Sequence, residues 1–95
     1  MPGHIDWSVV SAEDVHKAIA EFDRLGAEAF FERFGFAPTT TYDLKVDGSA
    51  YPPKGILGAA FELATGQRLA SADFEGGKSG AVKVLTALGF TVEAR

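Results

Sequence analysis

The sequence predicts a small α+β domain with its elements in the order ααββααβ. Two observations indicate this class. Four stretches carry apolar residues at helical spacing, and one stretch alternates apolar and polar residues around an Asp-Gly turn. The chain has 95 residues, of which 46% are hydrophobic, so it can form one core. We therefore expect a single domain spanning residues 1–95, in which residues 1–10 form a loosely ordered tail.

The first two predicted helices lie between residues 11 and 36. Ser11 is suited to cap a helix N-terminus, and acidic residues follow in the first turn, where the helix dipole favours negative charge. Gly26 ends this helix, and residues 27–34 form a second, shorter one before Gly35. The inward positions of the first helix follow the helical repeat: Val15, Ala18, Ile19, Phe22 and Leu25.

The pattern of residues 42–51 predicts a β-hairpin. Tyr42, Leu44 and Val46 alternate with polar residues, and Asp47-Gly48 is typical of a two-residue hairpin turn. Near the end of the chain, residues 90–93 can return as a third strand beside this hairpin. We expect the helices to pack on the resulting short antiparallel sheet.

The third and fourth predicted helices follow this hairpin. Pro52-Pro53 ends it, and because proline is tolerated in a first helical turn, we predict a helix over residues 53–65. A fourth helix begins near residues 77–79 and ends at Gly89.

The third helix contains two glycines, Gly55 and Gly58. Each costs about 1 kcal/mol of helix stability relative to alanine. Close packing of another helix, or of a ligand backbone, would explain them.

Both of these helix starts place a lysine where backbone N–H groups and the positive end of the helix dipole can hold an anion. Lys54 follows the diproline, and the other start carries the run Gly76-Gly77-Lys78-Ser79. A lysine in a first turn opposes the dipole, which mildly disfavours a purely structural role. The segments therefore predict phosphate contacts, and the alternative is that both lysines are simply solvated.

The run Gly77-Lys78-Ser79 also matches the tail of a nucleotide-binding P-loop. The complete motif requires a glycine where Ala72 stands, and a hydrophobic strand where residues 71–73 are turn-like. An NTP-using enzyme is therefore the weakest of the function classes considered.

No residue set suggests an active site. The chain has no cysteine, which excludes disulfides, thiolate zinc sites and a cysteine nucleophile. Its two histidines, His4 and His16, lack a third ligand at metal spacing. We expect no catalytic residue, no metal and no cofactor.

Charge and hydropathy limit the partners. The net charge is −4, but residues 1–36 hold seven acids against three bases, whereas residues 37–95 hold six of each. A polyanion should therefore meet the C-terminal half, and bind weakly. No segment approaches the roughly 18 apolar residues of a membrane span, and the N-terminus lacks a signal-peptide pattern. We expect a cytoplasmic protein with no membrane contact.

An ordered series of helix starts and turns carries a family resemblance. It comprises Ile19 to Gly26, Phe34-Gly35-Phe36, Tyr42, Leu44, Val46-Asp47-Gly48, Tyr51, Pro53-Lys54, Gly58-Ala59-Ala60, Phe74 to Gly77, and Leu85 to Phe90. From about Val10 to Glu93 the chain resembles the N-terminal head domain of McrA-like, modification-dependent HNH restriction endonucleases. The resemblance implies a non-catalytic accessory domain, either of such a type IV restriction enzyme or of a free-standing relative.

We therefore expect a module that binds nucleic acid, most simply duplex DNA. The competing class is a protein-interaction or assembly module that packs on another domain of a larger endonuclease or on a second copy. Tyr42 and Tyr51 flank the hairpin and are the aromatic side chains best placed to touch a base or sugar. The residues expected on the nucleic acid are Lys45, Tyr51, Lys54, Gly76, Gly77, Lys78, Ser79 and Lys83.

Overall fold

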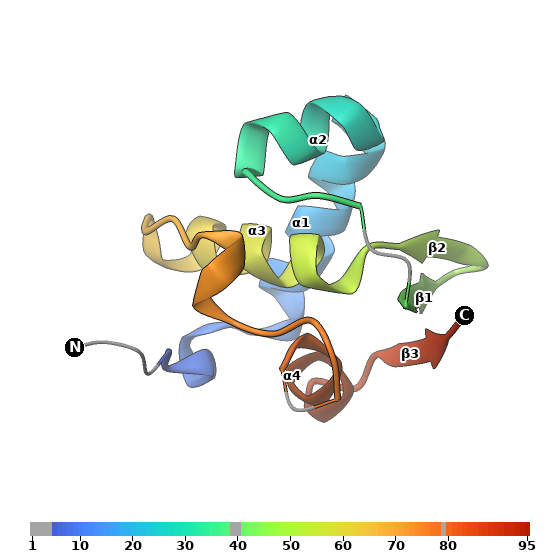
Figure 1. The fold of residues 1–95 in the computed structure, drawn as a ribbon. Coiled ribbons are helices and arrows are strands. Elements are labelled where there is room, and N and C mark those ends of the chain that lie inside the picture. The colour runs from blue at the N-terminus through green and yellow to red at the C-terminus, as the bar shows by residue number, and fades with distance from the viewer. Residues whose placement is uncertain (1–4, 39–40, 79) are drawn as a thin grey trace.

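The computed structural model describes residues 5–38, 41–78 and 80–95 and confirms the α+β class (Figure 1). Two 3-10 turns, η1 (Trp7–Val9) and η2 (Ser71–Asp73), accompany the main elements. These are α1 (Ala12–Leu25), α2 (Ala27–Phe34), β1 (Tyr42–Val46), β2 (Ser49–Tyr51), α3 (Pro53–Thr65), α4 (Ala81–Ala87) and β3 (Thr91–Ala94).

Helix α3 lies at the centre of the molecule. The elements α1, α2, α4, η1 and β1 all pack against it, and Figure 1 shows α2 above α3, α4 below it and the sheet beyond its first turn. Every residue from Gly55 to Phe61 is buried. A helix that is apolar on all sides is typical of such a central position.

The two glycines of α3 are explained by aromatic rings. A Cβ at Gly58 would lie 2.2 Å from Cζ of Phe36, and a Cβ at Gly55 would lie 3.3 Å from Cε1 of Phe31. Phe31 belongs to α2, and Phe36 follows that helix directly. The close packing expected at these glycines is therefore provided by α2 and the segment after it.

We predict that Gly58→Ala lowers the free energy of unfolding by about 1–3 kcal/mol, because overpacking the Phe36 ring outweighs the gain in helix propensity. Chemical denaturation measures this loss. Adding Phe36→Leu, which shortens the opposing side chain, should make the alanine less costly in a double-mutant cycle. A loss that is the same with and without Phe36→Leu would contradict the packing argument.

The sheet has the strand order β2-β1-β3, and both strand pairs are antiparallel. Leu44 in the central strand lies opposite Tyr51 of β2 and Val92 of β3, and it is fully buried. Side chains alternate across a strand, so the neighbouring Lys45 projects from the opposite face, where it is exposed. One face of the sheet therefore packs on the core and the other meets solvent.

The helix ends follow the local signals. The Ser11 hydroxyl accepts a hydrogen bond from the Asp14 N–H (3.2 Å), and the Asp14 carboxylate accepts one from the Ser11 N–H (3.0 Å). This reciprocal pair is a capping box. Gly35 and Gly66 end α2 and α3 in the left-handed conformation.

Helix α4 begins at Ala81, later than the predicted start at residues 77–79. Just before this helix, the Gly80 N–H donates to the Gly77 carbonyl at 2.9 Å. A Cβ at Gly80 would lie 2.0 Å from the carbonyl oxygen of Glu75, so this position requires glycine. The close approach of Gly80 to the Glu75 backbone leaves no mark in the helical spacing of apolar residues, so the sequence pattern places the helix start too early.

The N-terminal segment packs against the core where the structure describes it, from Ile5 onward. The Trp7 ring makes edge contacts with Phe61 (5.8 Å between ring centres) and Phe74 (5.1 Å). Val10 is buried at 3% exposure. Residues 5–10 therefore form part of the folded domain, held by contacts to distant residues.

Candidate nucleic-acid interface

Lys54 lies in the first turn of α3. Pro52 and Pro53 have no backbone N–H, so Lys54 and Gly55 provide the first N–H groups of this helix. The Lys54 side chain is half-buried, and its Nζ lies 5.3 Å from the centre of the Phe74 ring. Because an aromatic face attracts a cation, this contact holds the ammonium beside the loop that leads to α4.

Gly76 lies against the aliphatic part of Lys54. A Cβ at Gly76 would be 3.3 Å from both Cβ and Cδ of Lys54, closer than ordinary van der Waals contact. At the adjacent Gly77, no described atom beyond its chain neighbours would lie within 4 Å of a Cβ. The fold thus brings together Lys54 and Gly76, two of the predicted site residues that are far apart in the sequence.

The loop itself closes the N-terminus of α4. The Ala81 N–H donates to the Glu75 carbonyl (2.8 Å), and the Val82 N–H donates to the Gly77 carbonyl (3.1 Å). The sequence predicts that N–H groups at this helix start hold phosphate, but these two already have carbonyl acceptors. An anion bound here would therefore contact the loop and Lys78, which is exposed, rather than the helix end.

The remaining predicted residues lie on separate elements. Lys83 is exposed on α4, beside a hollow between this helix and η1. Lys45 is exposed on the solvent face of the sheet. Ser79 lies outside the described residues. The structure therefore groups Lys54, Gly76 and the following loop, and it places Lys45 and Lys83 on other elements.

Tyr51 is buried, with 7% of its surface exposed. Its hydroxyl donates to the Asp23 carboxylate at 3.0 Å, and its ring packs edge-on against Phe22. Burial raises the pKa of the Tyr51 hydroxyl above its usual value, and the hydrogen bond to Asp23 adds to this rise. The side chain joins β2 to α1, so its ring is not open to stacking with a base.

The arginines and lysines differ in their partners. All four arginines form ion pairs, whereas no lysine does so within the described part of the chain. A guanidinium matches the planar geometry of a carboxylate, but an ammonium is a flexible, strongly hydrated point charge. Within the described residues, the lysine ammonium groups therefore have no carboxylate partner. The pairs are Arg24–Glu21, Arg33–Glu62, Arg68–Glu62 and Arg95–Asp43.

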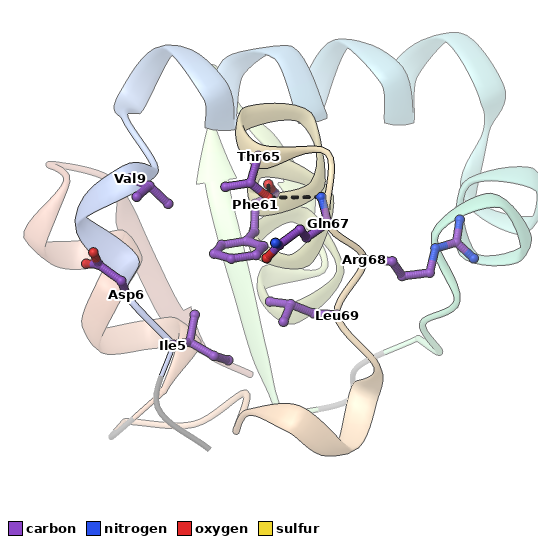
Figure 2. A pocket seen from close by; sticks show the side chains of 8 residues that line it. All are labelled: Ile5, Asp6, Val9, Phe61, Thr65, Gln67, Arg68 and Leu69. Carbon is purple, nitrogen blue, oxygen red and sulfur yellow. Dashed lines mark hydrogen bonds between the residues drawn. The ribbon is translucent and has the colours of Figure 1, made fainter. Parts of the chain in front are cut away.

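A hollow of about 480 Å³ lies between η1 and the segment after α3 (Figure 2). Phe61 contributes its ring, and the Gln67 N–H donates to the Thr65 hydroxyl at 3.0 Å. None of the predicted site residues lines this hollow. Its lining is Ile5, Asp6, Val9, Phe61, Thr65, Gln67, Arg68 and Leu69.

Sequence reasoning did not assign a role to Phe74, which contacts Lys54, or to Trp7, which packs against Phe74. The available signal for Trp7 was weak: Asp6 can cap a short turn, and its carboxylate does accept a hydrogen bond from the Ser8 N–H at 3.1 Å. For Phe74 no local signal exists, because its contact with Lys54 joins two residues that are distant in the sequence.

The geometry defines a small α+β domain in which one lysine, Lys54, is held against the aromatic ring of Phe74. In the residues that the structure describes, no three acidic or histidine side chains are grouped to bind a metal. The chain belongs to the family of ScoMcrA-like N-terminal head domains, whose family model matches residues 8–94. This confirms the resemblance inferred from the helix starts and turns.

Two further comparisons returned no match, one with curated proteins and one with solved structures. Among the helices of the described segments, none combines the length and the apolar character needed to cross a membrane.

Proposed function

We propose that this domain binds duplex DNA through its phosphates, as a non-catalytic part of a restriction endonuclease or of a relative. The observation that carries the proposal is the arrangement at Lys54. Its ammonium is unpaired by any carboxylate among the described residues, is held over Phe74, and lies beside a glycine-rich loop with a second exposed lysine, Lys78. Lysine and close-lying backbone are common contacts of phosphate.

The predicted site residues take different roles. Lys54 and Lys78 contact phosphate directly, and Gly76 and Gly77 let the DNA backbone approach the loop. Lys45 and Lys83 add support from the sheet and from α4. Tyr51 acts indirectly, since its buried ring and its bond to Asp23 keep the hairpin on α1.

The distribution of charge supports this orientation. The acidic excess lies within residues 1–36, which include α1 and α2. DNA should therefore meet the side of the molecule that carries the loop before α4, with the acidic helices turned away. The net charge of −4 predicts weak binding by the isolated domain.

Salt dependence tests the proposal. We expect the isolated domain to bind a fluorescent duplex weakly, with log affinity falling against log salt at a slope of about −3 to −4 if four lysines neutralise phosphates. Fluorescence anisotropy over a series of salt concentrations measures this slope. Binding that does not change with salt, or no binding at low salt, would exclude the proposal.

A second candidate is an assembly module, which one feature favours. A hollow of about 460 Å³ between η1 and α4 is lined mostly by apolar side chains. Val9 on η1 and Leu63 on α3 are exposed at 44% and 42%. If the domain failed to bind duplex but associated with another domain of the same enzyme or with itself, this second function would replace the first. The lining of the hollow is Trp7, Ser8, Val10, Lys83, Val84, Ala87 and Leu88.

The family also suggests a biological setting. A head domain of McrA-like proteins fits a role in restriction and defence in the cytoplasm, with nucleic acid and neighbouring domains as partners and without a cofactor. Cleavage would then be the task of another domain.

A further inference from the structure

We propose that Phe74 and Gly76 are positioning residues, which hold the Lys54 ammonium ready for a phosphate of the nucleic acid. This inference rests on the proposed function, because it assigns a role to residues that need not touch the ligand. Trp7 of η1 contributes to this positioning, because its ring packs against the Phe74 ring.

The first step is that the Phe74 ring is itself fixed. Trp7 meets it at a ring-centre distance of 5.1 Å with 68° between the planes, and Phe36 meets it at 5.9 Å with 67°. Edge-to-face arrangements of this kind are favourable for aromatic pairs. Two rings from distant segments therefore set the direction in which the face of Phe74 points.

The second step is that the Lys54 ammonium lies against this face of the Phe74 ring. The Nζ atom lies 5.3 Å from the ring centre, within the range of a cation–π contact. On another side, Gly76 approaches the Lys54 stem so closely that a methyl group would meet its Cβ and Cδ at 3.3 Å. The side chain is thus bounded by a ring and by a backbone segment.

The consequence is a lower cost of binding. A lysine loses considerable rotamer freedom when it is immobilised, and this loss reduces affinity. Lys54 has lost part of that freedom before the ligand arrives. An ammonium has three N–H donors, so a contact with a ring face leaves donors for a phosphate. Among the described lysines, no other has an aromatic ring in this position.

A matched pair of variants tests the ring. Phe74→Leu keeps an apolar side chain but removes the π face, and we expect duplex affinity to fall about two- to five-fold, the size of one partly exposed cation–π contact. Phe74→Tyr should restore wild-type affinity. Phe90→Leu is the control, because Phe90 is also half-buried but contacts His16 instead. It should leave affinity unchanged.

The residue Gly76 tests the other side. Gly76→Ala should push Lys54 aside and weaken binding, and in a Lys54→Ala background the same glycine change should cause no further loss, because the side chain that it displaces is gone. Proton NMR gives a readout that a purely structural role would not move. The ring current of Phe74 should displace the Lys54 side-chain methylene shifts in the free domain, and this displacement should vanish in Phe74→Leu while the remaining spectrum stays folded.

The outcomes separate the two proposals. If Lys54→Ala weakens duplex binding but Phe74→Leu and Gly76→Ala do not, the positioning role is wrong and the phosphate site stands. If Lys54→Ala has no effect, the phosphate site itself is wrong. If Phe74→Leu fails to fold, the decision rests on Gly76→Ala, and an equal loss of affinity from this change with and without Lys54→Ala would overturn the inference.

Discussion

Reversing the charge of both Lys54 and Lys78 should abolish duplex binding without unfolding the domain. A hydrogen bond to a charged group contributes at least about 1.5 kcal/mol, so each single change to glutamate should weaken binding by about ten-fold or more, whatever the DNA sequence. Lys78 is exposed, and glutamate at position 54 suits the N-terminal dipole of α3, which offsets the lost Phe74 contact. Anisotropy gives the affinities and circular dichroism the fold.

The matched control is Lys17→Glu on α1, where the lysine is also exposed and the change in net charge is the same. Because α1 carries acidic residues and should face away from DNA, this variant should show only a small long-range repulsion. If Lys17→Glu is as damaging as the other two changes, binding depends on net charge alone and the site assignment fails. If none of the three matters, the assembly function becomes the better hypothesis.

The largest effect on stability should come from Phe30→Ala. Phe30 is fully buried, and its ring packs against Phe22 at 5.1 Å and Phe34 at 4.9 Å. It also lies against the backbone at Gly55 of the central helix. Removing a buried phenylalanine costs about 3–5 kcal/mol. A domain of 95 residues has only about 5–14 kcal/mol in total, so the midpoint of denaturation should fall sharply.

Leu63→Ala is the comparison for this variant. Leu63 lies on the central helix α3 but is 42% exposed, so its truncation should change the free energy of unfolding by less than about 0.5 kcal/mol. If Phe30→Ala does not fold, Phe30→Leu should still lower the midpoint measurably. Equal midpoints for Phe30→Leu, Leu63→Ala and the wild type would mean that the described core is incorrect.

The features that the sequence predicted well are local ones. Ser11 and Asp14 lie within one helical turn, and Asp47-Gly48 can form a hairpin turn with its immediate neighbours alone. Gly35 and Gly66 end their helices because the left-handed conformation suits glycine. These signals depend on residues within a few positions of each other, so they can be read without knowledge of the fold.

Prediction was weaker wherever one residue depends on a distant one. Tyr51 alternates correctly in its strand, yet only the packing of β2 on α1 brings its hydroxyl to Asp23. The start of α4 was predicted too early because the approach of Gly80 to the Glu75 carbonyl has no periodic signal. The contact of Trp7 with Phe61 of α3 likewise joins residues that are distant in the sequence.

The sequence by itself determined the α+β class, the helix and strand order, and the presence of lysines beside helix starts. Only the tertiary structure decided which lysine is held in place, because Lys54, Phe74 and Gly76 come together across the fold. The physical reason is that capping, turns and periodicity act over a few residues of chain. The contact between a ring, an ammonium and a bare glycine backbone forms only when the core has packed.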